Sequence, residues 1–262
     1  MVLSSPIPFA EALQRSAVRA ILPTDLRSAE LRRLGAQVLE RSFFSARTAL
    51  ENVLEEYKTG IERILEPRTE TREDGTPVTR GMDRASLRLQ IKELLDRSGY
   101  EPDPEKRGGI EDLSSDKRID LVIQTNTEIA QGYGYWRQGQ DETLLDQWPA
   151  SELFRAEARK MERDWGTRWL DAAREAGDDA AVRAYGQTGR MVARKDSGVW
   201  QALGDGAGGY EDTLGAPYPP FAFSSGMDVR DVDRDDAVGL GLIDRDAQVE
   251  AQRAGFELPV ES

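Results

Sequence analysis

A polar cluster inside an apolar helical pattern constrains the fold of this chain more than any other feature. Apolar residues recur at helical spacing from Ile119 to Tyr133, which predicts a helix with one buried face. Four polar residues lie on or beside that face, namely Thr125, Asn126, Thr127 and Glu128. Because a buried amide or hydroxyl without a partner costs roughly 1–3 kcal/mol, the four are predicted to form a structural polar hub. Its expected partners lie in a distant segment, beyond residue 150.

Glu128 also permits a catalytic interpretation. A carboxylate in a cleft, faced by a second carboxylate, could act as the acid/base of a hydrolase. Buried polar groups are normally satisfied by structural partners, so the hub is the preferred interpretation. A carboxylate-dependent hydrolase with Glu128 as acid/base stays as the alternative.

The first hundred residues are predicted to form a helical region. A short helix over 9–22 ends at Pro23, and Ser28 can cap a long helix over 28–66 that is broken near 42–45. One apolar stripe in it must be covered, because a helix with such a face is not stable alone. Its residues are predicted to face the helix after Asp83 and a neighbouring subunit or partner protein: Leu50, Leu54, Tyr57 and Ile61.

Turn-forming residues divide the rest of the chain. Residues 67–82 contain Asp74-Gly75 and many charges, which predicts a loop. Proline and glycine over 101–112 predict a linker after the helical region 1–100. A mixed domain over 113–245 is expected next, with short strands at 152–158 and 190–193 and a tail over 246–262. The predicted fold class is therefore α+β and predominantly helical, with a long-helix N-terminal region before a mixed α+β domain.

Three segments in order carry a resemblance to a known family. They are Arg118–Gln140, which includes the polar cluster, Glu162–Trp169 with two tryptophans, and Pro217–Met227 with a Pro-Pro turn. Together they resemble the phage Mu F-like minor head (head morphogenesis) family over roughly half of the chain. Many members carry a histidine in the tryptophan segment and a His-x-x-Cys-x-Cys tail after the turn. This chain has neither, so any metal role of those residues is absent here.

The resemblance implies a structural and assembly component of a virion. Such a protein is expected at the capsid interior or portal vertex, and in the host cytoplasm during assembly. Its implied partners are portal and/or capsid proteins, with self-association as a further option. A binding module without a phage context is the remaining alternative.

Missing residue types exclude many kinds of chemistry. The chain has no His and no Cys, so histidine-based triads, thiol nucleophiles and zinc sites of His and Cys are excluded. Asp231, Asp233 and Asp235 alternate, but the sixth position of an EF-hand loop would be Asp236 and the twelfth Leu242. Asp233 is predicted instead to cap a short helix. No enzyme activity, cofactor or metal is expected.

Charge and hydropathy limit the partners. The chain has 35 Lys and Arg against 48 Asp and Glu, a net charge of −13, which opposes dedicated nucleic-acid binding. No run of 18 apolar residues occurs, so a soluble protein without a membrane span is expected. Four aromatic residues, Trp165, Trp169, Trp200 and Phe221, are predicted to lie in the core rather than to form a stacking platform.

Overall fold

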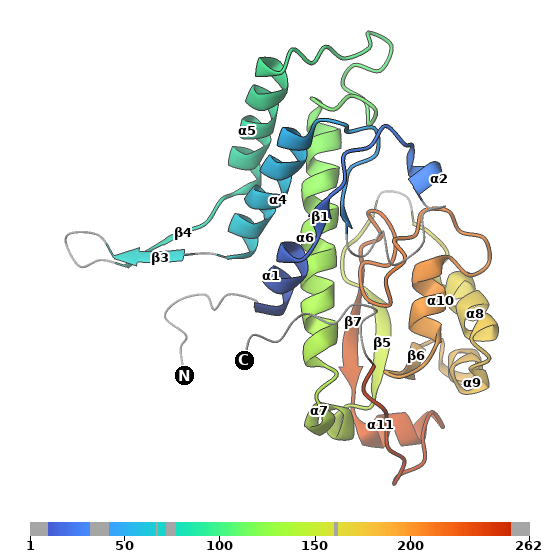
Figure 1. The fold of residues 1–262 in the computed structure, drawn as a ribbon. Helices are drawn as coiled ribbons and strands as arrows, with labels where there is room; N and C mark the ends of the chain where they lie inside the picture. The colour runs from blue at the N-terminus through green and yellow to red at the C-terminus, as the bar shows by residue number, and fades with distance from the viewer. Residues whose placement is uncertain (1–9, 32–41, 67, 72–76, 160–161, 253–262) are drawn as a thin grey trace. The chain divides into compact units, whose positions relative to one another are not determined.

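The computed structural model describes residues 10–31, 42–66, 68–71, 77–159 and 162–252. Its described residues form two compact units, unit 1 up to Gly134 and unit 2 from Tyr135 onward. The fold is α+β and predominantly helical, as predicted (Figure 1). The boundary lies inside helix α6, which spans Asp116–Gln138.

Unit 1 is mainly helical. Its elements are α1 (Ala10–Ala17), β1 (Ala20–Ile21), α2 (Ser28–Leu31), β2 (Ser42–Phe43), α4 (Glu51–Leu65), β3 (Arg68–Thr71), β4 (Pro77–Arg80), α5 (Arg84–Arg97) and most of α6. The expected helix over 28–66 is interrupted more widely than predicted: β2 lies at the expected break near 42–45 and pairs in parallel with β1, and α4 begins only at Glu51. Part of that span, residues 32–41, lies outside the described residues.

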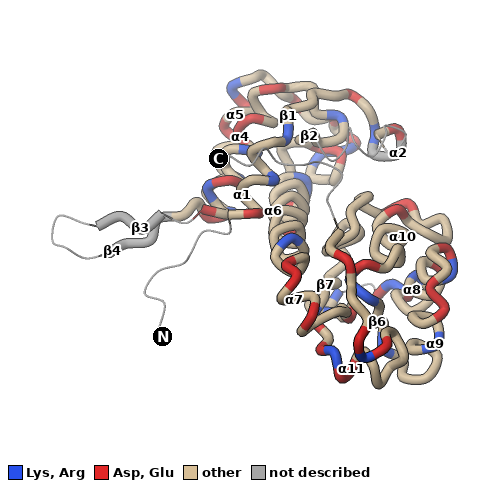
Figure 2. The backbone as a smooth tube through the Cα atoms, turned by 60° about the horizontal axis from the view of Figure 1, so that its bottom comes forward, with Lys and Arg blue, Asp and Glu red and all other residues tan. Residues whose placement is uncertain are grey.

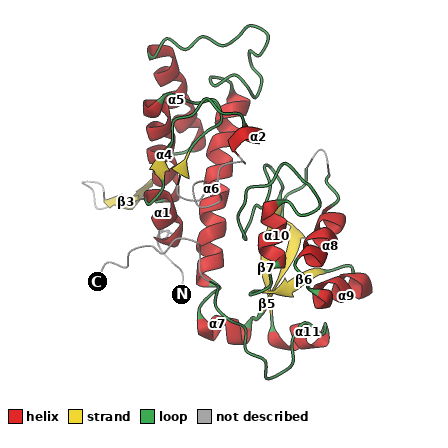
Figure 3. Cartoon of the chain, turned by 45° about the vertical axis from the view of Figure 1, so that its right-hand side comes forward, coloured by secondary structure: helices red, strands yellow, loops and turns green. Residues whose placement is uncertain are grey.

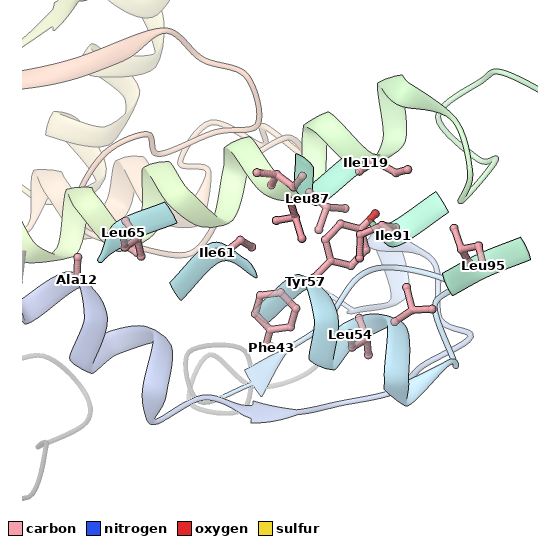
Figure 4. Close-up of a cluster of buried hydrophobic side chains, with 14 residues drawn as sticks. Ala12, Phe43, Leu54, Tyr57, Ile61, Leu65, Leu87, Ile91, Leu95 and Ile119 are labelled. Atoms are coloured by element: carbon pink, nitrogen blue, oxygen red, sulfur yellow. The ribbon is translucent and has the colours of Figure 1, made fainter. Parts of the chain in front are cut away.

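The apolar stripe of α4 lies in the core of unit 1. Leu54, Tyr57 and Ile61 are 0, 3 and 1% exposed, and Leu50 is partly buried at the edge of the same cluster. Their neighbours come from α5 and α6 and include Leu87 and Ile119 (Figure 4). The prediction that this stripe faces a second protein is wrong, because the unit's own helices cover it.

A hairpin replaces the loop predicted over residues 67–82. Strands β3 and β4 pair antiparallel, with Arg68 opposite Arg80. The Asp74-Gly75 turn lies outside the described residues. Threonine and valine suit a pleated strand, but the many charges of this segment conceal that pattern in the sequence.

The predicted linker over 101–112 is part of unit 1. Asp112 accepts hydrogen bonds from Gly108 N at 2.7 Å and Ser114 N at 2.9 Å, and Tyr100 Oη accepts one from Leu113 N at 3.0 Å. These side-chain bonds close a proline- and glycine-rich segment into ordered turns. Since the apolar face of α6 also packs in the core of unit 1, the boundary falls after that face rather than at the linker.

Unit 2 is built on a three-stranded antiparallel sheet of order β6-β5-β7 (Figure 3). Its elements after α6 are α7 (Glu142–Gln147), β5 (Ala150–Arg155), α8 (Trp165–Glu175), α9 (Asp179–Thr188), β6 (Met191–Arg194), α10 (Val199–Asp205), β7 (Met227–Val232) and α11 (Arg234–Gly239). The two strands predicted over 152–158 and 190–193 correspond to β5 and β6.

Both faces of this sheet are covered by apolar side chains. Successive residues of a strand point to opposite faces, so β5 contributes to both clusters. Leu153 packs with Trp169, Trp200 and Phe221 on one face, whereas Ala150 belongs to a separate apolar cluster. That second cluster includes Val192, Val232, Leu145 and Ala237.

Side-chain caps set the beginnings of several helices. Asp83 accepts a hydrogen bond from Ser86 N at 2.8 Å, and Ser115 Oγ accepts one from Arg118 N at 3.1 Å. Asp233 accepts one from Asp236 N at 2.8 Å, so the predicted cap of α11 is confirmed. No helix among the described residues is long and apolar enough to span a membrane.

Candidate functional site

An aromatic hollow lies on one face of the sheet in unit 2. It is lined by the end of α6, by the strands and by the Pro-Pro turn; the lining residues used below are Tyr135, Trp136, Ser151, Lys195, Trp200, Tyr218, Phe221 and Asp231. The cavity measures about 30 Å³, which is enough for one or two water molecules. We call this set the aromatic hollow.

Ring contacts build the walls of the hollow. The ring centroid of Trp200 lies 5.4 Å from that of Trp169, in an edge-on contact, and 6.1 Å from that of Phe221, in a stacked contact. The ring centroids of Trp136 and Tyr218 are 5.8 Å apart. Trp200 Nε1 donates a 2.7 Å hydrogen bond to the Arg194 carbonyl, which fixes the indole. Trp165, Trp169, Trp200 and Phe221 are all buried, so the prediction that they lie in the core is confirmed.

The Pro-Pro turn is held by its own side chains. Ser225 Oγ donates a 2.6 Å hydrogen bond to the Pro220 carbonyl and accepts one from Met227 N at 3.0 Å. Leu214 N donates to the Phe221 carbonyl at 2.9 Å. These bonds let Phe221 keep a φ of 60°, in the left-handed region, and present its ring to Trp200.

Three polar side chains meet at the rim of the hollow. Lys195 Nζ lies 2.7 Å from Asp231 Oδ1, so the two side chains form an ion pair. Tyr135 Oη donates to Asp231 Oδ2 at 3.2 Å. Burial and the charge of Asp231 raise the pKa of Tyr135 to about 12. The phenol therefore stays protonated near neutral pH and acts as a donor, not as a base.

An ion-pair network occupies the opposite face of the sheet. Glu152 Oε2 accepts from Arg190 Nη2 at 2.8 Å and from Arg230 Nη2 at 3.0 Å. Arg190 also pairs with Asp236 at 2.8 Å. Burial disfavours the charged carboxylate, but the bonds from the two arginines outweigh it, so the pKa of Glu152 lies below its ordinary value. The network ties the three strands together.

The predicted polar hub lies in unit 1. Asn126 Oδ1 accepts a 3.0 Å hydrogen bond from Arg19 Nη1, 107 residues away, and Asn126 Nδ2 donates to the Val122 carbonyl at 2.9 Å. The prediction that Asn126 bonds to a segment beyond residue 150 is therefore wrong. At Asn126, α6 packs against the N-terminal segment that carries Arg19. Thr125 and Thr127 are buried, and Thr127 Oγ1 has no partner among the described residues.

Glu128 is half-buried, lies on α6 and is not among the residues that line the aromatic hollow. It accepts a 2.6 Å hydrogen bond from Gln124 Nε2, one helical turn earlier. Such a pair is a common way to satisfy polar groups on one helix face. The bond gives Glu128 a structural partner.

Sequence reasoning missed Tyr135, Lys195 and Asp231 as members of one site. Lys195 lies two residues after the strand predicted over 190–193, which was the one local signal available. Their meeting depends on the pairing of β5 with both β6 and β7. Among the described residues, no group of three His, Cys, Asp or Glu side chains could hold a metal ion.

Comparisons of the chain with protein-family models, with curated proteins and with solved structures find no match.

Proposed function

We propose that this protein is a phage or prophage minor head protein, a non-enzymatic component of the virion that acts in assembly. One observation carries the proposal. The end of α6, the tryptophan segment and the Pro-Pro turn, which carry the resemblance, share one set of ring contacts in unit 2. Trp136 contacts Tyr218, and Trp169 reaches Phe221 of the same turn through Trp200. Three segments that resemble one family and also pack together support a shared origin with that family more than three unrelated chance similarities.

The chemistry of the hollow supports a structural role. Its cavity of about 30 Å³ is far below the roughly 300–1,000 Å³ typical of small-molecule pockets. Tyr135 is held protonated, and Lys195 is engaged by Asp231. The hydrolase alternative has less support, since Glu128 is bonded to Gln124 of its own helix.

The proposal includes the place of action and the partners. The protein acts at the capsid interior or portal vertex and contacts portal and/or capsid proteins. The host cytoplasm is where it is made and assembled. Because the apolar stripe of α4 is buried, the contacts with portal and/or capsid proteins are made by other surfaces than this stripe.

Gene deletion in the phage or prophage that encodes the chain tests the proposal. Purified procapsids and mature particles are analysed by quantitative mass spectrometry, and infectious titre is measured with and without a wild-type copy in trans. The expected result is a few copies per particle and a titre that falls on deletion and returns on complementation.

A matched pair of variants separates structure from catalysis. Glu128→Gln should complement the deletion if Glu128 has a structural role, and Leu89→Ala, on the exposed side of α5, controls for unrelated surface changes. A protein absent from both kinds of particle, with an unchanged titre on deletion, would refute the proposal. A Glu128→Gln variant that enters particles yet fails to complement would favour the hydrolase.

A further inference from the structure

Three arginines of unit 2 meet on one short segment, Phe223–Met227. Arg155 ends β5 and is the register partner of Met227 in β7. Arg159 packs so closely on Gly226 that a Cβ atom there would lie 2.8 Å from Arg159 Nε. Arg163 Nη2 donates a 2.7 Å hydrogen bond to the Phe223 carbonyl. We call Arg155, Arg159 and Arg163 the arginine patch.

The patch has more positive charge than its neighbours neutralise. Arg155 forms no ion pair within the part of the chain that the structure describes. Arg159 Nη2 lies 2.9 Å from Glu157 Oε2, whose side chain is 59% exposed, so this pair is weak. Arg163 Nε lies 3.2 Å from Asp212 Oδ2. That carboxylate is shared.

Asp212 is already engaged by a fourth arginine. Arg168 binds it with two hydrogen bonds, of 2.7 and 3.1 Å, and stacks on Tyr210 at 4.1 Å. Asp212 thus faces two guanidinium groups, those of Arg163 and Arg168, and its single negative charge balances only one of them. This surplus stands out in a chain whose net charge is −13; Figure 2 shows how acidic and basic residues are distributed along the backbone.

Unmet donors mark the same patch. Arg159 Nε and Arg163 Nη1 are screened from solvent and have no acceptor among the described residues. Burial lowers the pKa of Arg163; Asp212 opposes this effect, and the charges of Arg168, Arg159 and Arg155 add to it. Like charges at this density are unfavourable, and a bound anion would relieve the repulsion.

We propose that the arginine patch binds a phosphate-type oxyanion, either as free phosphate or as a phosphodiester of nucleic acid. Guanidinium groups match phosphate oxygens in geometry and stay charged. Arg155 and Arg159 are half-buried, so part of each side chain is accessible to an anion in solvent. The net charge of −13 opposes a broad nucleic-acid footprint, whereas three arginines suffice to contact one or two phosphates.

Binding measurements on the full chain test the site. Inorganic phosphate is titrated into the protein by calorimetry at constant ionic strength, and a short fluorescent DNA duplex is titrated separately at about 50 and 200 mM salt. The variants are Arg155→Gln and Arg159→Gln. Arg174→Gln is the charge-matched control, because its side chain is 63% exposed and lies 3.8 Å from Asp171. Thermal melts check that each variant is folded.

We expect the wild type to bind phosphate saturably. Each patch variant should weaken this binding about tenfold, equivalent to about 1.4 kcal/mol. Arg174→Gln should change it less than about twofold. If the duplex also binds and the same variants weaken its binding, the ligand of the patch is a phosphodiester of nucleic acid. If phosphate binds and the duplex does not, the ligand is the free anion. The proposal is overturned if the wild type binds neither probe, or if Arg174→Gln weakens binding as much as the patch variants.

Discussion

Gly60 is the position where a single methyl group tests the packing of unit 1. A Cβ atom on Gly60 of α4 would lie 2.2 Å from Leu87 Cδ1 and 2.7 Å from Leu87 Cδ2 of α5. Leu87 is fully buried, so its side chain has little room to move. Two effects of Gly60→Ala therefore oppose each other, the helix propensity of alanine and the overpacking of the core.

Overpacking should dominate at Gly60. Alanine in a helix interior gains about 1 kcal/mol over glycine, whereas forcing an extra methyl group into a filled core costs about 1–3 kcal/mol. Both methyl groups of Leu87 are in the way, which favours the upper part of that range. Gly60→Ala is therefore expected to lower the free energy of unfolding of unit 1 by about 1–2 kcal/mol. The control is Gly186→Ala in α9, where nothing lies within 4 Å of the added atom; it should stabilise unit 2 by about 0.5–1 kcal/mol.

Urea unfolding can follow the two units separately. All five tryptophans lie at or beyond residue 136, so indole fluorescence reports unit 2 alone, while far-UV circular dichroism reports the helices of both. Gly60→Ala should shift the dichroism transition to lower urea by about 0.5–1 M and leave the fluorescence transition in place. Gly186→Ala should move the fluorescence transition to higher urea.

A double-mutant cycle identifies the contact. Leu87→Ala removes the obstructing methyl groups, so Gly60→Ala should cost less in that background, with a coupling of about 1–2 kcal/mol. If Gly60→Ala stabilised unit 1, or if its cost were the same with and without Leu87, the close approach of α4 and α5 would be refuted.

Three further changes probe other features. Thr127→Val removes a buried hydroxyl that has no partner among the described residues and should stabilise unit 1 by about 1 kcal/mol in the same dichroism assay; a loss of stability would show that the hydroxyl is bonded. Glu152→Gln should destabilise unit 2 by about 1–2 kcal/mol at pH 7. Because the folded pKa of Glu152 is lowered, its contribution is complete above the unfolded pKa of about 4.3 and is lost as the pH falls through the folded pKa. The difference between the fluorescence-monitored melts of the two proteins should therefore shrink only below the unfolded pKa of about 4.3 and vanish once the pH has fallen through the lower folded pKa of Glu152. A difference that does not change as the pH is lowered would contradict this assignment. Leu54→Asp puts a charge into the core of unit 1 and should unfold it, at a cost above about 4 kcal/mol, whereas Leu89→Asp on the exposed side of α5 should change stability by less than about 0.5 kcal/mol; similar dichroism melts for the two would refute the burial of the stripe.

Local chemistry explains what could be predicted from the amino-acid order. The caps at Asp83, Ser115 and Asp233 depend on residues within one helical turn. The apolar faces of α4 and α6 depend on spacing alone, and so does the position of β5 and β6. Four aromatic residues could be placed in the core because large rings without a basic surrounding are usually buried. Each of these features needs information from neighbours only.

Tertiary structure decided which surfaces meet. Nothing near Asn126 in the sequence indicates Arg19 as its partner, and nothing near Leu54 shows that α5 and α6 leave no room for a second protein. Lys195 and Asp231 come together because β5 pairs with strands on both sides, and the boundary falls inside α6 because its apolar face ends there. Such contacts follow from the burial of apolar surface between distant segments, which is non-directional and so leaves no local pattern in the sequence.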